Sequence, residues 1–164
     1  MVAPSWPEPV ERVASFLRQA GAEARLEEFK SGTPTAQDAA DAAGCELTQI
    51  VKSLVFDCDG RPILVLVPGD RRADRRKIAA AAGCSSVRIA GSAEVEEATG
   101  FVPGAVAPFP LARIERVFID RNLLGHRLVW IGAGSPNHLA ALPPPELVRL
   151  ARAEPIDAAE DVAV

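Results

Sequence analysis

Several residue types that define common protein classes are scarce in this sequence. Among its 164 residues there is no tyrosine, and only two histidines and three cysteines occur. Cys45, Cys58 and Cys84 form no Cys-x-x-Cys motif and no cluster with histidine. We therefore expect neither a structural zinc site nor a disulfide framework, and we expect a reducing compartment.

Long apolar runs and a surplus of one charge are also absent. The longest apolar run, residues 63–68, is far too short to cross a membrane, and the first residues lack the pattern of a signal peptide. The 18 basic and 22 acidic residues give a net charge of −4, which argues against coating nucleic acid by bulk charge. A cytoplasmic protein is expected, with neither membrane nor DNA among its partners.

Three familiar catalytic or nucleotide-binding motifs are missing as well. The sequence contains no Gly-x-Ser-x-Gly, no Gly-x-x-x-x-Gly-Lys-Ser/Thr and no Gly-x-Gly-x-x-Gly. A serine nucleophile on a sharp turn and a standard nucleotide fold are therefore not supported. We expect no cofactor and no metal.

The remaining composition, 48% apolar and 24% charged, is that of one folded domain with a substantial core. Helical and strand-like patterns alternate irregularly, and Asp59-Gly60 predicts a hairpin, so the expected class is α+β with a mixed sheet. The domain would span residues 1–164, with an N-terminal helix at about 8–20, a core at about 24–152 and a loose C-terminal tail. Helices are expected at 8–20, 35–44, 70–82, 92–98 and 146–152, and strands at 24–29, 50–56, 62–67, 86–90, 116–120 and 127–131.

Lys52 is the first candidate for chemistry. In a strand over residues 50–56 it shares a face with Ile50, Leu54 and Phe56, where an unpaired ammonium would be costly. Either its side chain extends to water at the strand end, or it meets an anion or carbonyl in a polar cleft.

Residues 100–108 form a second candidate, a loop with two glycines and two prolines. Glycine lets the backbone approach a ligand and aim N–H groups at an oxyanion, while proline stiffens the loop. The alternative is an ordinary connection between a helix and a strand.

Five of the seven residues from Arg71 to Lys77 are basic. They form either a solvated helix face or a seat for the phosphates of a nucleic acid. The basic residues are Arg71, Arg72, Arg75, Arg76 and Lys77.

Taken in order, several short motifs resemble the YbaK/EbsC family, which includes the editing insertion domain of bacterial prolyl-tRNA synthetases. The resemblance extends from about Thr33 to Leu150. The motifs are Thr35-Ala36-x-Asp38-Ala39-Ala40, Gln49-Ile50-Val51-Lys52-Ser53-Leu54-Val55-Phe56, Val67-x-Gly69-Asp70-Arg71-Arg72-x-Asp74, Thr99-Gly100-Phe101 and Gly104-x-x-x-Pro108-Phe109.

The resemblance implies a mixed, barrel-like sheet and hydrolysis of mischarged aminoacyl-tRNA, with no nucleophile from the protein. Lys52 would anchor the terminal phosphate or polarise the ester, and backbone N–H groups near Gly100 and Gly104 would hold the amino acid and the developing oxyanion. The expected partners are aminoacyl-tRNA, held at the basic residues, and prolyl-tRNA synthetase. Further expected substrate contacts are Thr35, Ser53, Phe101, Pro108, Gly134 and His138.

Two departures leave the branch of the family open. Pro110 stands where many members have glycine, and residues 132–138 differ from the basic loop of the YbaK branch. The amino acid removed would be alanine, cysteine, serine or threonine, from tRNA for proline. The alternatives are a non-catalytic module that binds tRNA or a synthetase, and a hydrolase of another small ester.

Overall fold

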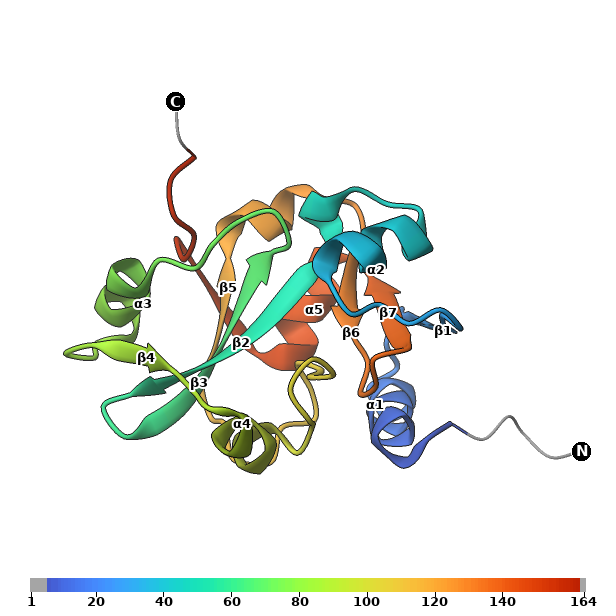
Figure 1. Ribbon diagram of the computed structural model, residues 1–164, viewed down its shortest axis with the longest axis horizontal. Coiled ribbons are helices and arrows are strands. Elements are labelled where there is room, and N and C mark those ends of the chain that lie inside the picture. Colours follow the sequence, from blue (N-terminus) through green and yellow to red (C-terminus); the bar gives the residue numbers. More distant parts are fainter. Residues whose placement is uncertain (1–5, 163–164) are drawn as a thin grey trace, which may run out of the picture.

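Two β-sheets, with helices between and around them, make up the fold of the computed structural model, which describes residues 6–162 (Figure 1). The helices are α1 Glu8–Gln19, α2 Ala36–Ala43, α3 Arg75–Ala82, α4 Ser92–Thr99 and α5 Pro144–Ala151, with 3-10 turns η1 Leu47–Gln49 and η2 Arg121–Gly125. The strands are β1 Arg25–Glu28, β2 Val51–Cys58, β3 Arg61–Pro68, β4 Val87–Ile89, β5 Val117–Asp120, β6 Val129–Gly132, β7 His138–Leu142 and β8 Ala153–Ile156.

The larger sheet has the strand order β4-β2-β3-β5-β8 and the smaller one β1-β7-β6. In the larger sheet β4, β2 and β3 are antiparallel, whereas β5 runs parallel to both β3 and β8. Within the described residues, an isolated parallel bridge between Ile50 and Trp130 joins the two sheets. The α+β class and the mixed sheet are therefore confirmed, although the sheets do not close into a barrel within the described residues.

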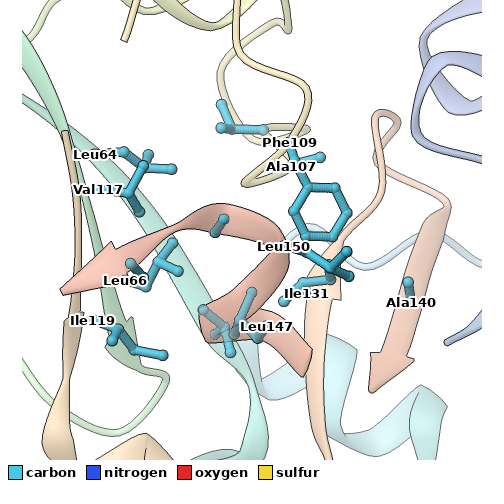
Figure 2. Close-up of a cluster of buried hydrophobic side chains, with 14 of the residues drawn as sticks. Leu64, Leu66, Ala107, Phe109, Val117, Ile119, Ile131, Ala140, Leu147 and Leu150 are labelled. Atoms are coloured by element: carbon cyan, nitrogen blue, oxygen red, sulfur yellow. The ribbon is translucent and has the colours of Figure 1, made fainter. Parts of the chain in front are cut away.

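The main core lies between the two sheets, and one face of α5 packs into it (Figure 2). Leu147 and Leu150 of α5 point toward Leu66 and Ile119 of the larger sheet and Ile131 of the smaller one. Because these side chains are almost completely buried, apolar burial fixes how the two sheets meet, and the Ile50–Trp130 bridge lies at that junction.

Local signals account for most of the element boundaries. Thr35 caps α2 by accepting a hydrogen bond from Asp38 N–H at 3.0 Å, and Gly44 ends the helix with φ +69°. Asp59 and Gly60 both have positive φ, as a tight hairpin turn between β2 and β3 requires.

Some expectations about the elements were wrong. The third helix begins at Arg75 rather than Asp70, because the Asp74 carboxylate caps it by accepting from the backbone N–H groups of Arg76 and Lys77. The strands expected at 116–120 and 127–131 are present as β5 and β6, which belong to different sheets, and η2 lies between them.

The C-terminal region also differs from expectation. The tail is not loose over the described residues, because β8 pairs with β5 and Ala158 and Ala159 are fully buried. The buried Asp120 carboxylate accepts hydrogen bonds from the N–H groups of both alanines, at 2.8 and 3.1 Å. Residues 153–162 are called the C-terminal segment below.

The cysteines correct a further expectation. Cys58 at the end of β2 and Cys84 after α3 form a disulfide across 26 residues of sequence, with their Cα atoms 5.6 Å apart. The spacing alone could not reveal this pair, because the two residues meet only after β4 docks on β2. Cys45 is free.

Candidate functional site

A cleft of about 310 Å³ opens where the two sheets meet, beside the first half of β2. Lys52, Ser53, Thr35 and Gly104, four of the residues expected at the site, line it together. The other lining residues are Thr33, Pro34, Ala36, Ala39, Ile50, Val51, Leu54, Val106, Gly132, Ser135 and Leu139. A larger hollow of about 620 Å³ lies beside α1, but it contains none of the expected site residues.

Lys52 is half-buried in the cleft. Its ammonium donates a hydrogen bond to the backbone carbonyl of Arg71 at 2.5 Å. Burial lowers the pKa of Lys52, and the charge of Arg72 lowers it further, while the carboxylate of Asp70 acts in the opposite direction. An ammonium has three N–H donors, so two remain for an anion or carbonyl in the cleft.

Ser53 offers polar groups of two kinds. Its hydroxyl is buried and has no hydrogen-bond partner among the described residues. In an antiparallel pair, successive residues of a strand direct their backbone groups to opposite sides. The Val55 carbonyl accepts from Ala90 N–H on the side of β2 away from β3, so the backbone groups of Ser53 point to that same side. That side of β2 is open at Ser53. Ser53 therefore has both a side chain and a backbone suited to a ligand in the cleft.

The Gly104 loop forms another wall of the cleft. Gly104 has φ +83°, and the space that a Cβ would occupy is open. The following residues are buried, and the carbonyl of Val106 packs so closely on Gly132 that a Cβ there would lie 2.6 Å from its oxygen. Gly132 thus holds the loop against β6, a role that the sequence did not reveal.

Thr35 has a structural task at the rim of the cleft. Its hydroxyl donates to the Asp38 carboxylate at 2.8 Å while also capping α2. The residue thereby fixes the helix end that lines the cleft, and a substrate contact by Thr35 stays a prediction.

The loop between β6 and β7 brings a residue to the cleft that sequence analysis missed, Ser135. His138 lies behind it, only 3% exposed, with Nδ1 2.5 Å from the Ser135 hydroxyl. Gly134 instead packs on the start of α1, where a Cβ would meet the carbonyl of Pro9 at 2.7 Å. The serine could have been noticed only as a hydroxyl three residues before histidine.

The remaining expected substrate contacts lie outside the lining of the cleft. Gly100 ends α4, and its carbonyl accepts a hydrogen bond from Arg12 at 2.7 Å. Phe101 is buried beneath the same guanidinium, 4.8 Å from ring centre to Cζ, and Pro108 is also buried. A direct substrate contact by any of these three residues stays a prediction.

The basic segment, residues 71–77, is only partly available to a ligand. Arg72, Arg75 and Arg76 are exposed. Lys77 instead forms ion pairs with Asp157 and Asp161, and the Arg71 side chain donates to the Glu160 carbonyl. The segment follows β3 directly and touches the cleft through the Arg71 carbonyl that holds Lys52.

The family model for the aminoacyl-tRNA editing domain matches residues 30–150. The chain belongs to this family. It is thus a YbaK-type protein related to the editing insertion domain of prolyl-tRNA synthetase. The matched range contains every residue that lines the cleft.

Individual relatives agree with this membership. An uncharacterized protein of Bacillus subtilis, YwhH, is 34% identical over 82% of this chain and 86% of its own length. A proline–tRNA ligase of Maridesulfovibrio salexigens is 36% identical over 57% of this chain, which spans only 16% of the ligase. A solved structure of a candidate trans-editing enzyme for prolyl-tRNA synthetase superposes with a TM-score of 0.89 at 36% identity, covering 96% of this chain and all of that one.

No helix within residues 6–162 has the length and apolarity needed to span a lipid bilayer.

Proposed function

We propose that the protein is a trans-editing hydrolase that removes a small, wrong amino acid from tRNA for proline. The observation that carries this proposal is the meeting of the Lys52 ammonium and the Gly104 loop in one cleft of an aminoacyl-tRNA editing domain. The amino acid would be alanine, cysteine, serine or threonine, and prolyl-tRNA synthetase is the proposed partner.

The lining of the cleft suits such a substrate. Ala39, Ile50, Val106 and Leu139 give it apolar walls, which match a small side chain. An apolar pocket discriminates by only about 1–3 kcal/mol for each methylene, which is why a separate editing step is useful for small amino acids.

The chemistry asks little of the protein beyond position and charge. An aminoacyl ester is already activated, so a fixed cation and fixed donors aimed at the developing oxyanion can supply most of the acceleration. Lys52 would anchor the terminal phosphate or polarise the ester carbonyl, and backbone N–H groups near Gly104 would stabilise the oxyanion. Water, or a hydroxyl of the substrate itself, would attack the ester.

The test is deacylation of proline tRNA charged with alanine, cysteine, serine or threonine, with correctly charged prolyl-tRNA as the reference substrate. Lys52→Ala should lower the rate at least about tenfold, equivalent to about 1.4 kcal/mol of transition-state stabilisation. Lys30→Ala, at an exposed lysine, should leave it unchanged.

The other outcomes are equally informative. Full activity of Lys52→Ala, with the fold intact by circular dichroism, would remove Lys52 from the mechanism. Cleavage of small esters without any need for tRNA would indicate a different substrate class. Absence of cleavage together with tRNA binding that survives Lys52→Ala would indicate a binding module.

A further inference from the structure

A hydroxyl, an imidazole and a carboxylate lie in a row in space at one wall of the cleft. Ser135 lines the cleft, and its Oγ is 2.5 Å from Nδ1 of the buried His138. The opposite ring nitrogen, Nε2, is 3.3 Å from Oε2 of Glu28 on the neighbouring strand β1. This order is the one found where a base activates a hydroxyl and a third group orients the base.

The hydrogen bonds around Ser135 allow it to donate to His138. Its Oγ accepts from the backbone N–H of Asn137 at 3.0 Å, and its hydroxyl donates to Nδ1 of His138 in the tautomer that carries the imidazole proton on Nε2. In that tautomer the Nε2 proton is directed to the side of Glu28. Nε2 makes no completed hydrogen bond, so a small rotation of the half-exposed Glu28 side chain is all that the contact requires.

The surrounding backbone holds this arrangement in place. The Pro136 carbonyl accepts from both the N–H and the hydroxyl of Thr33, and the Asn137 carbonyl accepts from Phe29 N–H. Both Thr33 and Ser135 line the cleft, so the loop is fixed on the side that faces the ligand. A rigid, preorganised donor is what catalysis by proton transfer needs.

Two side chains pack against the imidazole. The Glu28 carboxylate of β1 faces Nε2, and the edge of the Trp6 ring covers the imidazole at 5.5 Å between ring centroids. These contacts fix the orientation of the ring, as a relay through the imidazole requires.

We propose that Ser135, His138 and Glu28 form a proton relay for ester hydrolysis, an inference that rests on the proposed function. As the attacking water or hydroxyl forms its bond to the ester carbon, its proton passes to Ser135 Oγ, whose own proton passes to Nδ1 of His138. When the ester C–O bond breaks, the proton returns by the same path to the leaving oxygen of the tRNA. Ser135 is the catalytic residue that meets the reacting atoms, and Glu28 is a positioning residue.

The experiment compares single-turnover deacylation between pH 5 and 8 for the wild-type protein and for Ser135→Ala, His138→Gln and Glu28→Gln. Loss of a general base costs about 10²–10⁴ in rate, so Ser135→Ala and His138→Gln should each lose about 10²-fold. The pH dependence of the rate should differ from that of the wild type in both variants, because the path that takes up the proton is lost. The double variant should be no slower than the slower single variant, because the two residues act as one unit.

Glu28→Gln guards against an effect of misfolding. Glu28 is half-exposed on an edge strand, so the variant should fold, and loss of the group that orients the imidazole should slow deacylation without weakening tRNA binding. Glu27→Gln, one residue earlier on the same strand, is the matched control and should leave rate and pH profile unchanged.

Two results separate this inference from the proposed function. A wild-type protein that deacylates while Ser135→Ala keeps both its rate and its pH profile overturns the relay alone. A wild-type protein that cleaves none of the charged tRNAs overturns both.

Discussion

Lys52 and Lys77 are lysines of one chain in opposite environments. Lys52 is half-buried against a carbonyl, and burial lowers its pKa. Lys77 has the carboxylates of Asp161 and Asp157 at its ammonium, and these raise its pKa. The Lys52 ammonium therefore has little negative charge beside it and can bind a ligand anion. The Lys77 ammonium is already paired with two carboxylates.

We expect this difference to be visible in a titration. The chain has only three lysines, so ¹³C-labelled lysine should give three assignable side-chain signals. Lys52 should titrate below the ordinary lysine value of about 10.4, and below Lys77. Asp70→Asn should lower the Lys52 midpoint further, because it removes the charge that favours the ammonium, and Arg72→Gln should raise it.

The sign for stability follows from the same shift. The folded state disfavours the charged form of Lys52, so the contribution of this residue to stability is smallest at neutral pH and improves as pH rises through its folded-state pKa. A Lys52 midpoint at or above that of Lys77 would show that the ammonium is not desolvated, and the account of its environment would be wrong.

At the scale of elements, the position of the Gly104 loop depends on the absence of a side chain at Gly132 in β6. A Cβ at Gly132 would approach the Val106 oxygen to 2.6 Å and the Val106 carbonyl carbon to 3.4 Å. Both atoms belong to backbone, which cannot rotate away as a side chain would. The loop must therefore move if this glycine is replaced.

Gly132→Ala should lower the free energy of unfolding by about 1–3 kcal/mol, the usual cost of overpacking, and should also slow deacylation. Gly125→Ala is the control, because a Cβ there meets nothing within 4 Å. Urea unfolding of both variants measures the first effect. Equal stability of the two variants would mean that the loop is not held by its contact with Gly132.

Elements with local signals could be predicted, and elements defined by distant partners could not. The Thr35 cap, the Gly44 stop and the Asp59-Gly60 turn each act within a few residues, so α2 and the β2–β3 hairpin were expected correctly. Strand β7 was missed; it pairs with its neighbour β6 and with β1, which lies more than a hundred residues away in sequence.

The same limit applies to the site. Lys52 and Gly104 could be named in advance through the family resemblance, and the structure brings them into one cleft. Ser135 could not, because it reaches the cleft only through the β6–β7 turn. Its contact with Glu28, through His138, depends on the pairing of β7 with β1.

At the scale of the whole molecule, the C-terminal segment covers part of the basic segment. Ala159 bridges Ala73, and the N–H of Glu160 donates to the Arg72 carbonyl at 2.8 Å. The segment thereby fixes the loop whose Arg71 carbonyl holds Lys52, and it places Asp157 and Asp161 at Lys77. Order at the C-terminus is thus linked to both the cleft and the charge available to tRNA.

This arrangement predicts opposite effects of two double substitutions on tRNA binding. Arg75→Gln with Arg76→Gln removes exposed cations, so affinity should fall and the salt dependence should flatten by about 0.7–0.9 in slope for each phosphate that the protein no longer neutralises. Asp157→Asn with Asp161→Asn releases Lys77 and removes two repelling charges, so affinity should rise. Fluorescence anisotropy with labelled tRNA, over a range of about 50–200 mM salt, measures both.

The control must remove the same charge elsewhere. Arg18→Gln with Arg113→Gln does so. Arg18 lies on α1, on the side of the molecule away from α3, and the exposed Arg113 pairs with Glu97 of α4 (Figure 1). Exposed ion pairs contribute only about 0–1 kcal/mol, so none of these variants should unfold the protein. If the control weakens binding as much as the Arg75 and Arg76 pair, net charge alone governs the affinity and tRNA does not bind at the basic segment. If only the Arg75 and Arg76 substitutions weaken binding, the tRNA backbone crosses α3 beside the loop that holds Lys52. A tRNA bound there could place its charged end in the cleft.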